Sequence, residues 1–321
     1  MKRTKLPDNK GFDFKIKAVP GKGLSGRFIF PPFSVLRAME GEWMRRKQQW
    51  ISLGIESEIG RGETPDSTTS NTKEDAIDGL TFRSTGFMAD IIKERGGGTS
   101  IFDPVLCELM YAWFCPTAGQ VVDPFAGGSV RGIVAAYMGY KYWGSELRQE
   151  QVDANKKQGE QITPNCTPEW VCGDAMQEVI HAPDADFIFS CPPYGNLEVY
   201  SDLEGDISNM DYYEFYDAYH KIIRRCCHKL KQNRFACFVV ANFRDKKTGF
   251  YYDFVGDTVR AFESNGVKLY NEAVLVTATG SLPVRVGRQF AAGRKLGKTH
   301  QNILVFYKGD PKQIKGVFNK E

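Results

Sequence analysis

The sequence predicts an α/β protein built around a mostly parallel β-sheet, and three observations support that prediction. From residue 100 onward, short apolar segments of strand length alternate with longer segments of helical periodicity. Glycine, proline and acidic residues follow several apolar segments directly, at places where a strand turns into a helix. The composition, 42% hydrophobic and 25% charged among 321 residues, is that of an ordinary globular protein. Alternation of this kind favours a parallel sheet with helices on both faces.

The expected elements follow one another in a regular order. We expect strands near residues 120–122, 141–145, 170–172, 186–190, 235–241, 267–277 and 301–307. Helices are expected over 103–115, 129–138, up to about 158, 211–230 and 252–264. No helix is expected between the last two strands. We therefore predict a seven-stranded sheet with an antiparallel strand at one edge.

Three regions divide the chain: an N-terminal extension over 1–98, an α/β domain over 99–310 and a tail over 311–321. Apolar residues recur at helical spacing from Phe33 to about Leu53, with a basic run at 45–47 between them. Two interpretations of this helix stay open: it docks with a solvated basic face, or it contacts phosphates. The polar stretch 59–78 predicts a linker or mobile loop.

Charge and cysteine content exclude several classes of protein. The formal net charge is only +3, so the distribution of charge, not its total, must indicate a partner. Eight cysteines without a CxxC pair, beside four histidines, do not fit a structural zinc site, and we expect no metal. The chain opens on polar sequence and holds no apolar stretch of bilayer-spanning length. These features predict a reduced, soluble, cytoplasmic protein.

A glycine-containing turn follows the first strand of the α/β domain. It reads Asp123-Pro124-Phe125-Ala126-Gly127-Gly128-Ser129. Glycines at such a turn let the backbone approach a ligand closely and point N–H groups toward it. The pattern is not GxGxxG, so a dinucleotide site is not indicated. Taken alone, the turn also fits an ordinary tight connection between a strand and a helix.

Acidic residues end the next two strands. Glu146 follows the strand near 141–145, where a carboxylate can accept two hydrogen bonds from a ribose diol. Asp174 follows the strand after that, and it can accept from an exocyclic adenine amine. Each acid alone would fit a helix cap or a solvated loop. Together, three consecutive strand ends with polar groups predict a nucleoside site at the carboxyl edge of the sheet.

The fourth strand runs into Ser190-Cys191-Pro192-Pro193-Tyr194. Two prolines make a rigid turn, and Tyr194 follows them directly at the expected site, where an aromatic ring could stack on a base. With the Asp123–Gly128 turn and the two acids, this strand end resembles S-adenosylmethionine-dependent DNA methyltransferases. The most similar are amino-methyltransferases with a DPPY-type motif, and the modification methylases of phage and bacteria. The resemblance covers about residues 99–309.

The resemblance implies a Rossmann-like methyltransferase fold, S-adenosylmethionine as cofactor, and DNA methylation in a bacterial or phage-infected cell, in a modification or restriction–modification setting. It assigns the methionine part of the cofactor to Phe125–Gly128, the ribose to Glu146 and the adenine to Asp174. It also assigns residues 100–104, with Phe102 and Asp103, to an additional cofactor segment. The target would be a base in double-stranded DNA, which must be flipped out to reach the cofactor.

One residue departs from the family pattern. The family has Asp, Asn or Ser to accept hydrogen bonds from a target amine, whereas this chain has Cys191, and a thiol is a poor acceptor. In one interpretation Ser190 or a backbone carbonyl binds the amine, for methylation at cytosine N4 or adenine N6. In the favoured interpretation Cys191 is a nucleophile that adds to cytosine C6 and activates C5. Its order is Cys-Pro, whereas the cysteine-dependent C5 enzymes have Pro-Cys.

Methylation at C5 also needs an acid near N3 of the base. Glu198 and Asp202 on the same loop are candidates, although either would fit a solvated loop or a helix cap. Tyr194 and Phe290 are aromatic candidates for holding or replacing the flipped base. The other cysteines are expected to be small core residues.

Residues 281–300 carry many basic side chains and no acid. Glycines and prolines punctuate the stretch, so we expect a loop between the last two strands that contacts DNA phosphates; a solvated basic loop is the alternative. The candidate contacts are Arg285, Arg288, Gln289, Arg294, Lys295 and Lys298. Asn242, Arg244 and Asp245 could also contact base or phosphate, or cap a helix. An RNA methyltransferase would share only the cofactor site, and an inactive DNA-binding protein need not keep that site.

Overall fold

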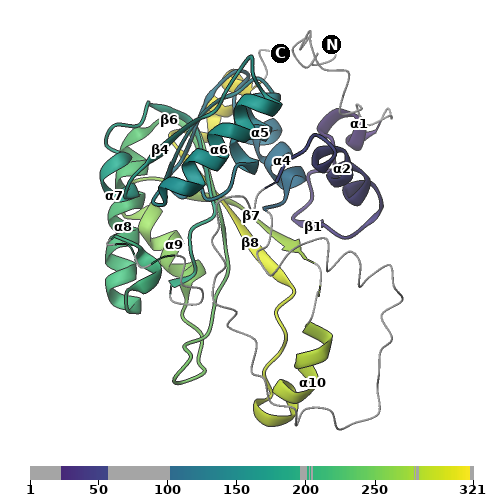
Figure 1. The fold of residues 1–321 in the computed structure, drawn as a ribbon, viewed down its shortest axis with the longest axis vertical. Helices are drawn as coiled ribbons and strands as arrows, with labels where there is room; N and C mark the ends of the chain where they lie inside the picture. Colours follow the sequence, from purple (N-terminus) through teal and green to yellow (C-terminus); the bar gives the residue numbers. More distant parts are fainter. Residues whose placement is uncertain are drawn as a thin grey trace.

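An eight-stranded β-sheet organises the computed structural model (Figure 1), which describes residues 23–56, 102–195, 201, 203, 205–277, 279 and 282–318. The strands are β1 (Val35–Arg37), β2 (Gln120–Asp123), β3 (Lys141–Glu146), β4 (Glu169–Cys172), β5 (Ala185–Ser190), β6 (Leu230–Val240), β7 (Lys268–Val276) and β8 (His300–Lys308). Their order across the sheet is β1-β7-β8-β6-β5-β2-β3-β4. Because β6, β5, β2, β3 and β4 are mutually parallel, their carboxyl ends meet at one edge.

Helices cover both faces of the sheet. One face carries α4 (Pro104–Phe114), α5 (Val130–Tyr137) and α6 (Gln149–Ile162), and the other carries α7 (Ala175–Glu178), α8 (Tyr212–Lys229) and α9 (Phe254–Glu263). Successive side chains along a strand point alternately toward the two helical layers. Phe187 and Phe189 of β5 pack on the α4 side, and Ile188 between them packs on the α8 side. This Rossmann-like arrangement confirms the predicted α/β fold class.

The sheet differs from the seven-stranded prediction in two respects. β8 is antiparallel to both of its neighbours, but it lies between β6 and β7 and not at the edge. The edge is occupied by β1, a strand from the N-terminal region that pairs in parallel with β7. Both differences concern pairing between segments far apart in the sequence, which local periodicity does not specify.

The N-terminal helix is shorter than its periodicity suggested, because residues 35–37 belong to β1. Two helices lie in this region, α1 (Leu24–Phe28) and α2 (Gly41–Ile51). Arg46 of α2 is 4% exposed and donates through Nε to Oε2 of Glu108 in α4, at 2.6 Å. Trp50 Nε1 donates to the same carboxylate at 2.9 Å. Arg46 therefore holds α2 against α4, which supports the docked interpretation of this helix.

The structure also corrects the expectation that residues 281–300 form a loop. Leu282–Gly293 is a helix, α10, and the residues after it lead into β8. Pro283 lies in the first turn of α10, where its missing N–H costs no hydrogen bond, and Gly293 ends the helix. None of the residues of α10 is buried, and the helix stands apart from the body of the protein (Figure 1). The last helix among the described residues is the short α11 (Ile314–Phe318).

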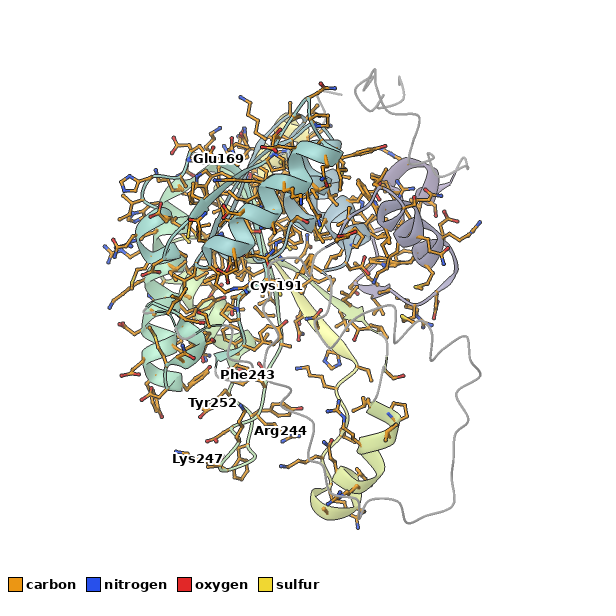
Figure 2. The ribbon with its side chains drawn as sticks, viewed as in Figure 1. Glu169, Cys191, Phe243, Arg244, Lys247 and Tyr252 are labelled. Atoms are coloured by element: carbon orange, nitrogen blue, oxygen red, sulfur yellow. The ribbon has the colours of Figure 1, made fainter. Side chains whose placement is uncertain are left out.

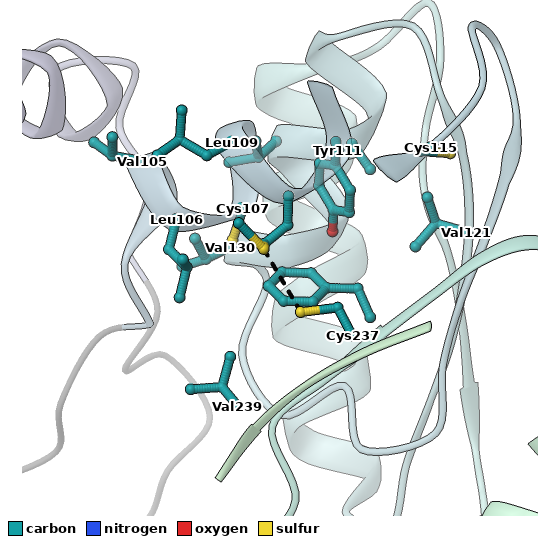
Figure 3. Close-up of a cluster of buried hydrophobic side chains, with 14 of the residues drawn as sticks. Val105, Leu106, Cys107, Leu109, Tyr111, Cys115, Val121, Val130, Cys237 and Val239 are labelled. Carbon is teal, nitrogen blue, oxygen red and sulfur yellow. Dashed lines mark hydrogen bonds between the residues drawn. The ribbon is translucent and has the colours of Figure 1, made fainter. Parts of the chain in front are cut away.

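Five of the eight cysteines fill the two cores. Figure 3 shows Cys107, Cys115 and Cys237 among buried apolar side chains, with Cys237 Sγ 3.6 Å from Met110 Sδ. Cys226 and Cys227 are buried on the other face of the sheet. Burial raises the pKa of Cys227 to about 12 and that of the other four thiols well above its usual range. The prediction of core cysteines is confirmed for these five, whereas Cys166 and Cys172 are exposed.

Candidate active site

The three polar turns predicted to bind a nucleoside and the turn predicted to carry catalysis are neighbours at the carboxyl edge of the sheet. The strand order β5-β2-β3-β4 places them side by side. The catalytic turn is residues 191–195, after β5. The others are residues 123–129 at the end of β2, 146–148 at the end of β3 and 173–174 after β4. Figure 2 locates Cys191 at this edge, between the body of the protein and the segments that extend beyond it.

Asp123 is the centre of a buried hydrogen-bond network and does not face the site. Its side chain is fully buried and accepts from Arg131 Nε at 2.6 Å, Tyr142 OH at 2.8 Å, Ser190 Oγ at 2.5 Å and the backbone N–H of Phe125 at 3.1 Å. Burial and the neighbouring Asp123 charge raise the pKa of Tyr142, so its hydroxyl keeps the proton that it donates. The assignment of Asp123 as a direct cofactor contact is therefore corrected: four donors hold its carboxylate inside the protein.

Arg131 fastens the glycine-containing turn to this network. Its Nη2 donates to the carbonyl oxygens of Phe125 at 2.5 Å and Ala126 at 2.9 Å. Burial is the largest single effect and lowers the pKa of Arg131, but the charge and hydrogen bond of Asp123, together with the interactions with Tyr142 and Cys191, raise that pKa above its usual value. Sequence reasoning missed this residue. The signal was available, since Arg131 is the one charged residue in the otherwise apolar α5.

The backbone of the turn is held in a conformation that leaves three residues open to a ligand. Pro124 and Ala126 are buried, whereas Phe125, Gly127 and Gly128 are partly exposed. Gly127 has φ +52°, a conformation that favours glycine, and its carbonyl accepts from Asn155 Nδ2 at 2.7 Å. Direct contact with a cofactor is thus open to Phe125, Gly127 and Gly128, and Pro124 and Ala126 have a structural role.

Glu146 and Asp174 lie at the ends of β3 and β4, as predicted. Oε1 of Glu146 accepts from the backbone N–H of Arg148 at 3.1 Å and from its Nε at 3.3 Å, and the side chain is 13% exposed. Asp174 is the N-cap of α7 and accepts from the N–H of Met176 at 2.8 Å. A Cβ on Gly205 would lie 3.5 Å from Oδ2 of Asp174, so a distant part of the chain closes over this carboxylate.

Phe102 and Asp103, predicted to form an additional cofactor segment, have different surroundings. The Phe102 ring lies over the Arg131 guanidinium at 4.6 Å, beside the glycine-containing turn. Asp103 is the N-cap of α4 and accepts from the N–H of Val105 at 2.9 Å and from Lys47 Nζ at 3.1 Å. Capping and an ion pair to α2 thus engage the Asp103 carboxylate, and its contact with the cofactor stays a prediction.

The turn after β5 presents Cys191, Pro193 and Tyr194, all partly exposed, while Pro192 is buried. Cys191 Sγ lies 3.9 Å from the Tyr194 hydroxyl, which accepts from Gln301 Nε2 of β8 at 2.7 Å. The Tyr194 ring packs edge-on against Phe254 of α9, with centroids 6.0 Å apart. Packing and a hydrogen bond from β8 therefore orient the aromatic residue beside the thiol.

The structure places Ser190, a candidate catalytic residue, but does not describe the candidate acids Glu198 and Asp202. Ser190 is completely buried and its hydroxyl donates to Asp123, so the assignment of Ser190 as acceptor for a target amine is corrected. Glu198 and Asp202, the candidate acids, lie outside the described residues. Without Ser190, acceptance from an amine falls to a backbone carbonyl, and Cys191 is the reactive side chain that the described part of this turn offers.

The predicted DNA contacts lie on α10 and on the segment that follows it. The side chains of Arg285, Arg288, Gln289, Arg294 and Lys295 are exposed. Lys298 is half-buried and donates to the carbonyl of Asn242 at 2.8 Å. The Arg294 guanidinium lies 5.3 Å from the ring centroid of Phe290, which is 42% exposed. Phe290 is thus an exposed aromatic residue on a basic helix, away from the turn at Tyr194.

Asn242 contacts the first turn of α9, and Asp245 stabilises a turn of its own segment; the sequence left both roles open. Asn242 Oδ1 accepts from the N–H of Val255 in α9 at 2.8 Å. Asp245 Oδ1 accepts from the N–H of Lys247 at 2.6 Å, and this hydrogen bond lowers the pKa of Asp245. Arg244 stacks on Tyr251, with its guanidinium carbon 4.0 Å from the ring centroid.

Comparison with known proteins finds similar folds but no matching family model and no matching curated sequence. TrmN from Thermus thermophilus is 14% identical over 64% of this chain and 49% of its own, with a TM-score of 0.46. Magnesium protoporphyrin IX methyltransferase from Synechocystis PCC 6803, crystallised with SAM, is 13% identical over 71% and 93% of the chains, with a TM-score of 0.43. A provisionally assigned DNA modification methylase, also from Thermus thermophilus and complexed with S-adenosylmethionine, is 19% identical over 43% and 51%, with a TM-score of 0.31.

These likenesses concern the arrangement of the chain in space and carry no argument about substrate. The chain spans about half the length of the TrmN structure. In the ranges that the structure describes, no helix is both long enough and apolar enough to cross a bilayer.

Proposed function

We propose that this protein is an S-adenosylmethionine-dependent methyltransferase that acts on a base of double-stranded DNA. The observation that carries the proposal is the position of β2 between β3 and β5. It sets the turn at Phe125–Gly128 beside Glu146 and Asp174 on one side and beside Cys191–Tyr194 on the other. A donor that lies along the first three groups would present its methyl group toward the fourth.

The cofactor would supply an activated methyl group, and the chain would bind and orient it. Phe125, Gly127 and Gly128 would contact the methionine part, Glu146 the ribose hydroxyls and Asp174 the adenine amine. Arg131 would not touch the cofactor. It would hold the turn open through its hydrogen bonds to the carbonyls of Phe125 and Ala126.

DNA is favoured as substrate because α10 and the segment after it carry five basic residues and no acid, Arg285, Arg288, Arg294, Lys295 and Lys298. Figure 1 shows that α10 lies beyond the carboxyl edge of the sheet. Arginine and lysine at this position would neutralise phosphates and retain the duplex while a base enters the site. The segment is joined to the end of β6 by the hydrogen bond from Lys298 to Asn242, which keeps it near the turn at Cys191.

The favoured target is cytosine C5. The thiolate of Cys191 would add to C6, and C5 would take the methyl group as the carbon–sulfur bond of the cofactor sulfonium breaks and leaves a neutral thioether. Loss of the C5 proton to solvent water would then reform the double bond and release the thiolate. The position of Cys191 supports this assignment, because the residue is partly exposed at the turn after β5 and its Sγ lies 3.9 Å from the Tyr194 hydroxyl. The alternative is methylation of an exocyclic amine, at cytosine N4 or adenine N6, with a backbone carbonyl of the double-proline turn as acceptor.

The test is to incubate DNA with the protein and S-adenosylmethionine, digest the DNA to nucleosides and identify the methylated nucleosides by mass spectrometry. The assay shows both whether DNA is the substrate and which base atom carries the methyl group. We expect 5-methylcytosine with the wild-type protein and none with Cys191→Ser. Calorimetric titration with S-adenosylmethionine is the control, because C191S should bind the cofactor like the wild-type protein. N4-methylcytosine or N6-methyladenine, or activity that survives in C191S, would refute the C5 assignment. Methyl transfer to RNA but not to DNA would refute the proposed substrate.

A further inference from the structure

We propose that residues 243–252, here called the arm, form a second contact surface for duplex DNA that acts together with α10. The inference rests on the proposed function and adds a binding element that the basic segment at 281–300 does not include. In Figure 2 the arm extends past the carboxyl edge below Cys191, with Phe243 and Tyr252 at its root and Arg244 and Lys247 farther out.

The arm is a hairpin with defined internal bonding. Arg244 and Tyr251 form an antiparallel bridge, and the N–H of Tyr252 donates to the carbonyl of Phe243 at 2.9 Å. At the tip, the N–H of Gly249 donates to the carbonyl of Asp245 at 2.9 Å. Arg244 Nη1 reaches across to the carbonyl of Gly249, also at 2.9 Å. A hairpin held in this way can present side chains in fixed positions.

The root of the arm is fixed to the catalytic turn by aromatic packing. Phe243 is 5% exposed, and a Cβ on Gly195 would lie 2.7 Å from its Cζ. Tyr252 stacks on Tyr212 of α8 with centroids 3.8 Å apart and planes 9° apart. Phe254, which packs on Tyr194, also contacts Phe243, with centroids 5.8 Å apart. The arm and the turn at Tyr194 therefore share one rigid base.

The chemistry of the exposed part suits nucleic acid. Between 243 and 252 the sequence has three cations, Arg244, Lys246 and Lys247, and one acid. That acid, Asp245, accepts hydrogen bonds from its own turn, so its charge is used inside the arm. Phe250 at the tip is 78% exposed. Cations beside an exposed aromatic ring can bind phosphates and stack on a base.

The arm and the basic segment after α10 are in contact, which makes them one surface. Besides its hydrogen bond to Asn242, Lys298 Nζ lies 5.7 Å from the ring centroid of Tyr251. A Cβ on Gly249 would lie 3.2 Å from Lys295 Nζ. Burial lowers the pKa of Lys298, as expected for a half-buried lysine that joins two elements. A duplex that contacts Arg294 and Lys295 would therefore also meet the arm.

The experiment compares two double variants of equal charge by fluorescence anisotropy with a labelled duplex. K246Q/K247Q removes two charges from the arm. K312Q/K315Q removes two exposed charges from the chain just after β8, which ends at the opposite edge of the sheet. We expect K246Q/K247Q to weaken binding and to reduce the slope of log Kd against log salt by about 2, since each phosphate contact contributes about 0.9. K312Q/K315Q should bind like the wild-type protein.

Phe250→Ala gives an independent readout. It should weaken duplex binding several-fold and leave the salt slope unchanged, because stacking releases no counterions. Equal losses in the two lysine double variants, or losses only with structured RNA as probe, would overturn the inference. If wild-type protein methylates DNA while K246Q/K247Q and F250A keep wild-type affinity, the arm inference alone fails. If the wild-type protein binds S-adenosylmethionine and no duplex at low salt, the proposed substrate fails as well.

Discussion

Ser190 Oγ donates a hydrogen bond of 2.5 Å to Oδ1 of Asp123, and this contact joins the last residue of β5 to the last residue of β2. The strand that carries the proposed catalytic turn is thereby tied to the strand that carries the proposed cofactor turn. Both side chains are fully buried. The relative position of the two turns consequently depends on a buried hydrogen bond that neither the cofactor nor the target base would contact.

Replacing Ser190 by Ala should destabilise the protein without removing a group from the site. A hydrogen bond to a buried carboxylate contributes roughly 1–3 kcal/mol, so we expect a loss of that size in urea unfolding. Ser52→Ala is the control, because Ser52 Oγ donates to a carbonyl on the exposed end of α2. If S190A unfolds like S52A, the network around Asp123 is not holding the strand ends.

Arg131→Met should be far more damaging, because it leaves the buried Asp123 carboxylate without its cation. Breaking a buried pair in this way costs about 3–5 kcal/mol. The double variant D123N/R131M should recover part of that loss, since no charge is left buried. Calorimetric melting measures both, and a double variant less stable than R131M alone would contradict the ion-pair account. Affinity for S-adenosylmethionine should fall in R131M, because the turn loses its two carbonyl hydrogen bonds.

Glu146 and Glu150 provide a matched pair for the cofactor site, since both carboxylates pair with Arg148. Glu146→Gln should weaken S-adenosylmethionine binding about 10-fold or more, because hydrogen bonds to the charged carboxylate would be lost. The side chain of Glu150 is 59% exposed, and exposed ion pairs contribute little. Glu150→Gln should therefore bind S-adenosylmethionine with an affinity within about 2-fold of that of the wild-type protein. Calorimetric titration measures the affinity of both variants for S-adenosylmethionine. Equal losses of affinity in E146Q and E150Q would mean that Glu146 does not bind the ribose.

The cysteines should react with iodoacetamide in a defined order. The five core thiols have raised pKa values and no access to solvent, so they should react only on unfolding. Burial and the Glu146 charge raise the pKa of Cys172, so less of it is thiolate at a given pH and its rate should rise at higher pH than that of a free thiol. S-adenosylmethionine should slow labelling of Cys191. Peptide mass spectrometry reads each site, and labelling of Cys107 in the folded protein would contradict the burial.

Gly195→Ala tests the link between the catalytic turn and the arm. Gly195 has φ +51°, and an added Cβ would meet Phe243, so we expect a loss of roughly 2–4 kcal/mol from backbone strain and overpacking. Gly316→Ala is the matched control, because its Cβ would meet nothing within 4 Å. The measurement is urea unfolding together with duplex binding. A G195A protein as stable as G316A would mean that Phe243 can move without cost.

Local sequence pattern by itself determined the α/β class and, except for the short helix α7, the alternation of strands and helices from α4 to α9. It also located the polar turns at residues 123–128 and 191–194. Apolar periodicity specifies strands and helices, and glycine and proline specify where the chain turns, because both effects act within a few residues. Glu146 and Asp174 could be placed at strand ends for the same reason, and the structure has them there.

Only the tertiary structure decided which polar groups face a ligand. The sequence predicted that Asp123 contacts the cofactor, whereas in the structure its carboxylate accepts hydrogen bonds from three different elements. The donors are Arg131, Tyr142 and Ser190. The insertion of β8 between β6 and β7, and the contact of Lys298 with the arm, likewise depend on segments distant in sequence. A buried carboxylate must find donors wherever the fold brings them, and that requirement is met in space and not along the chain.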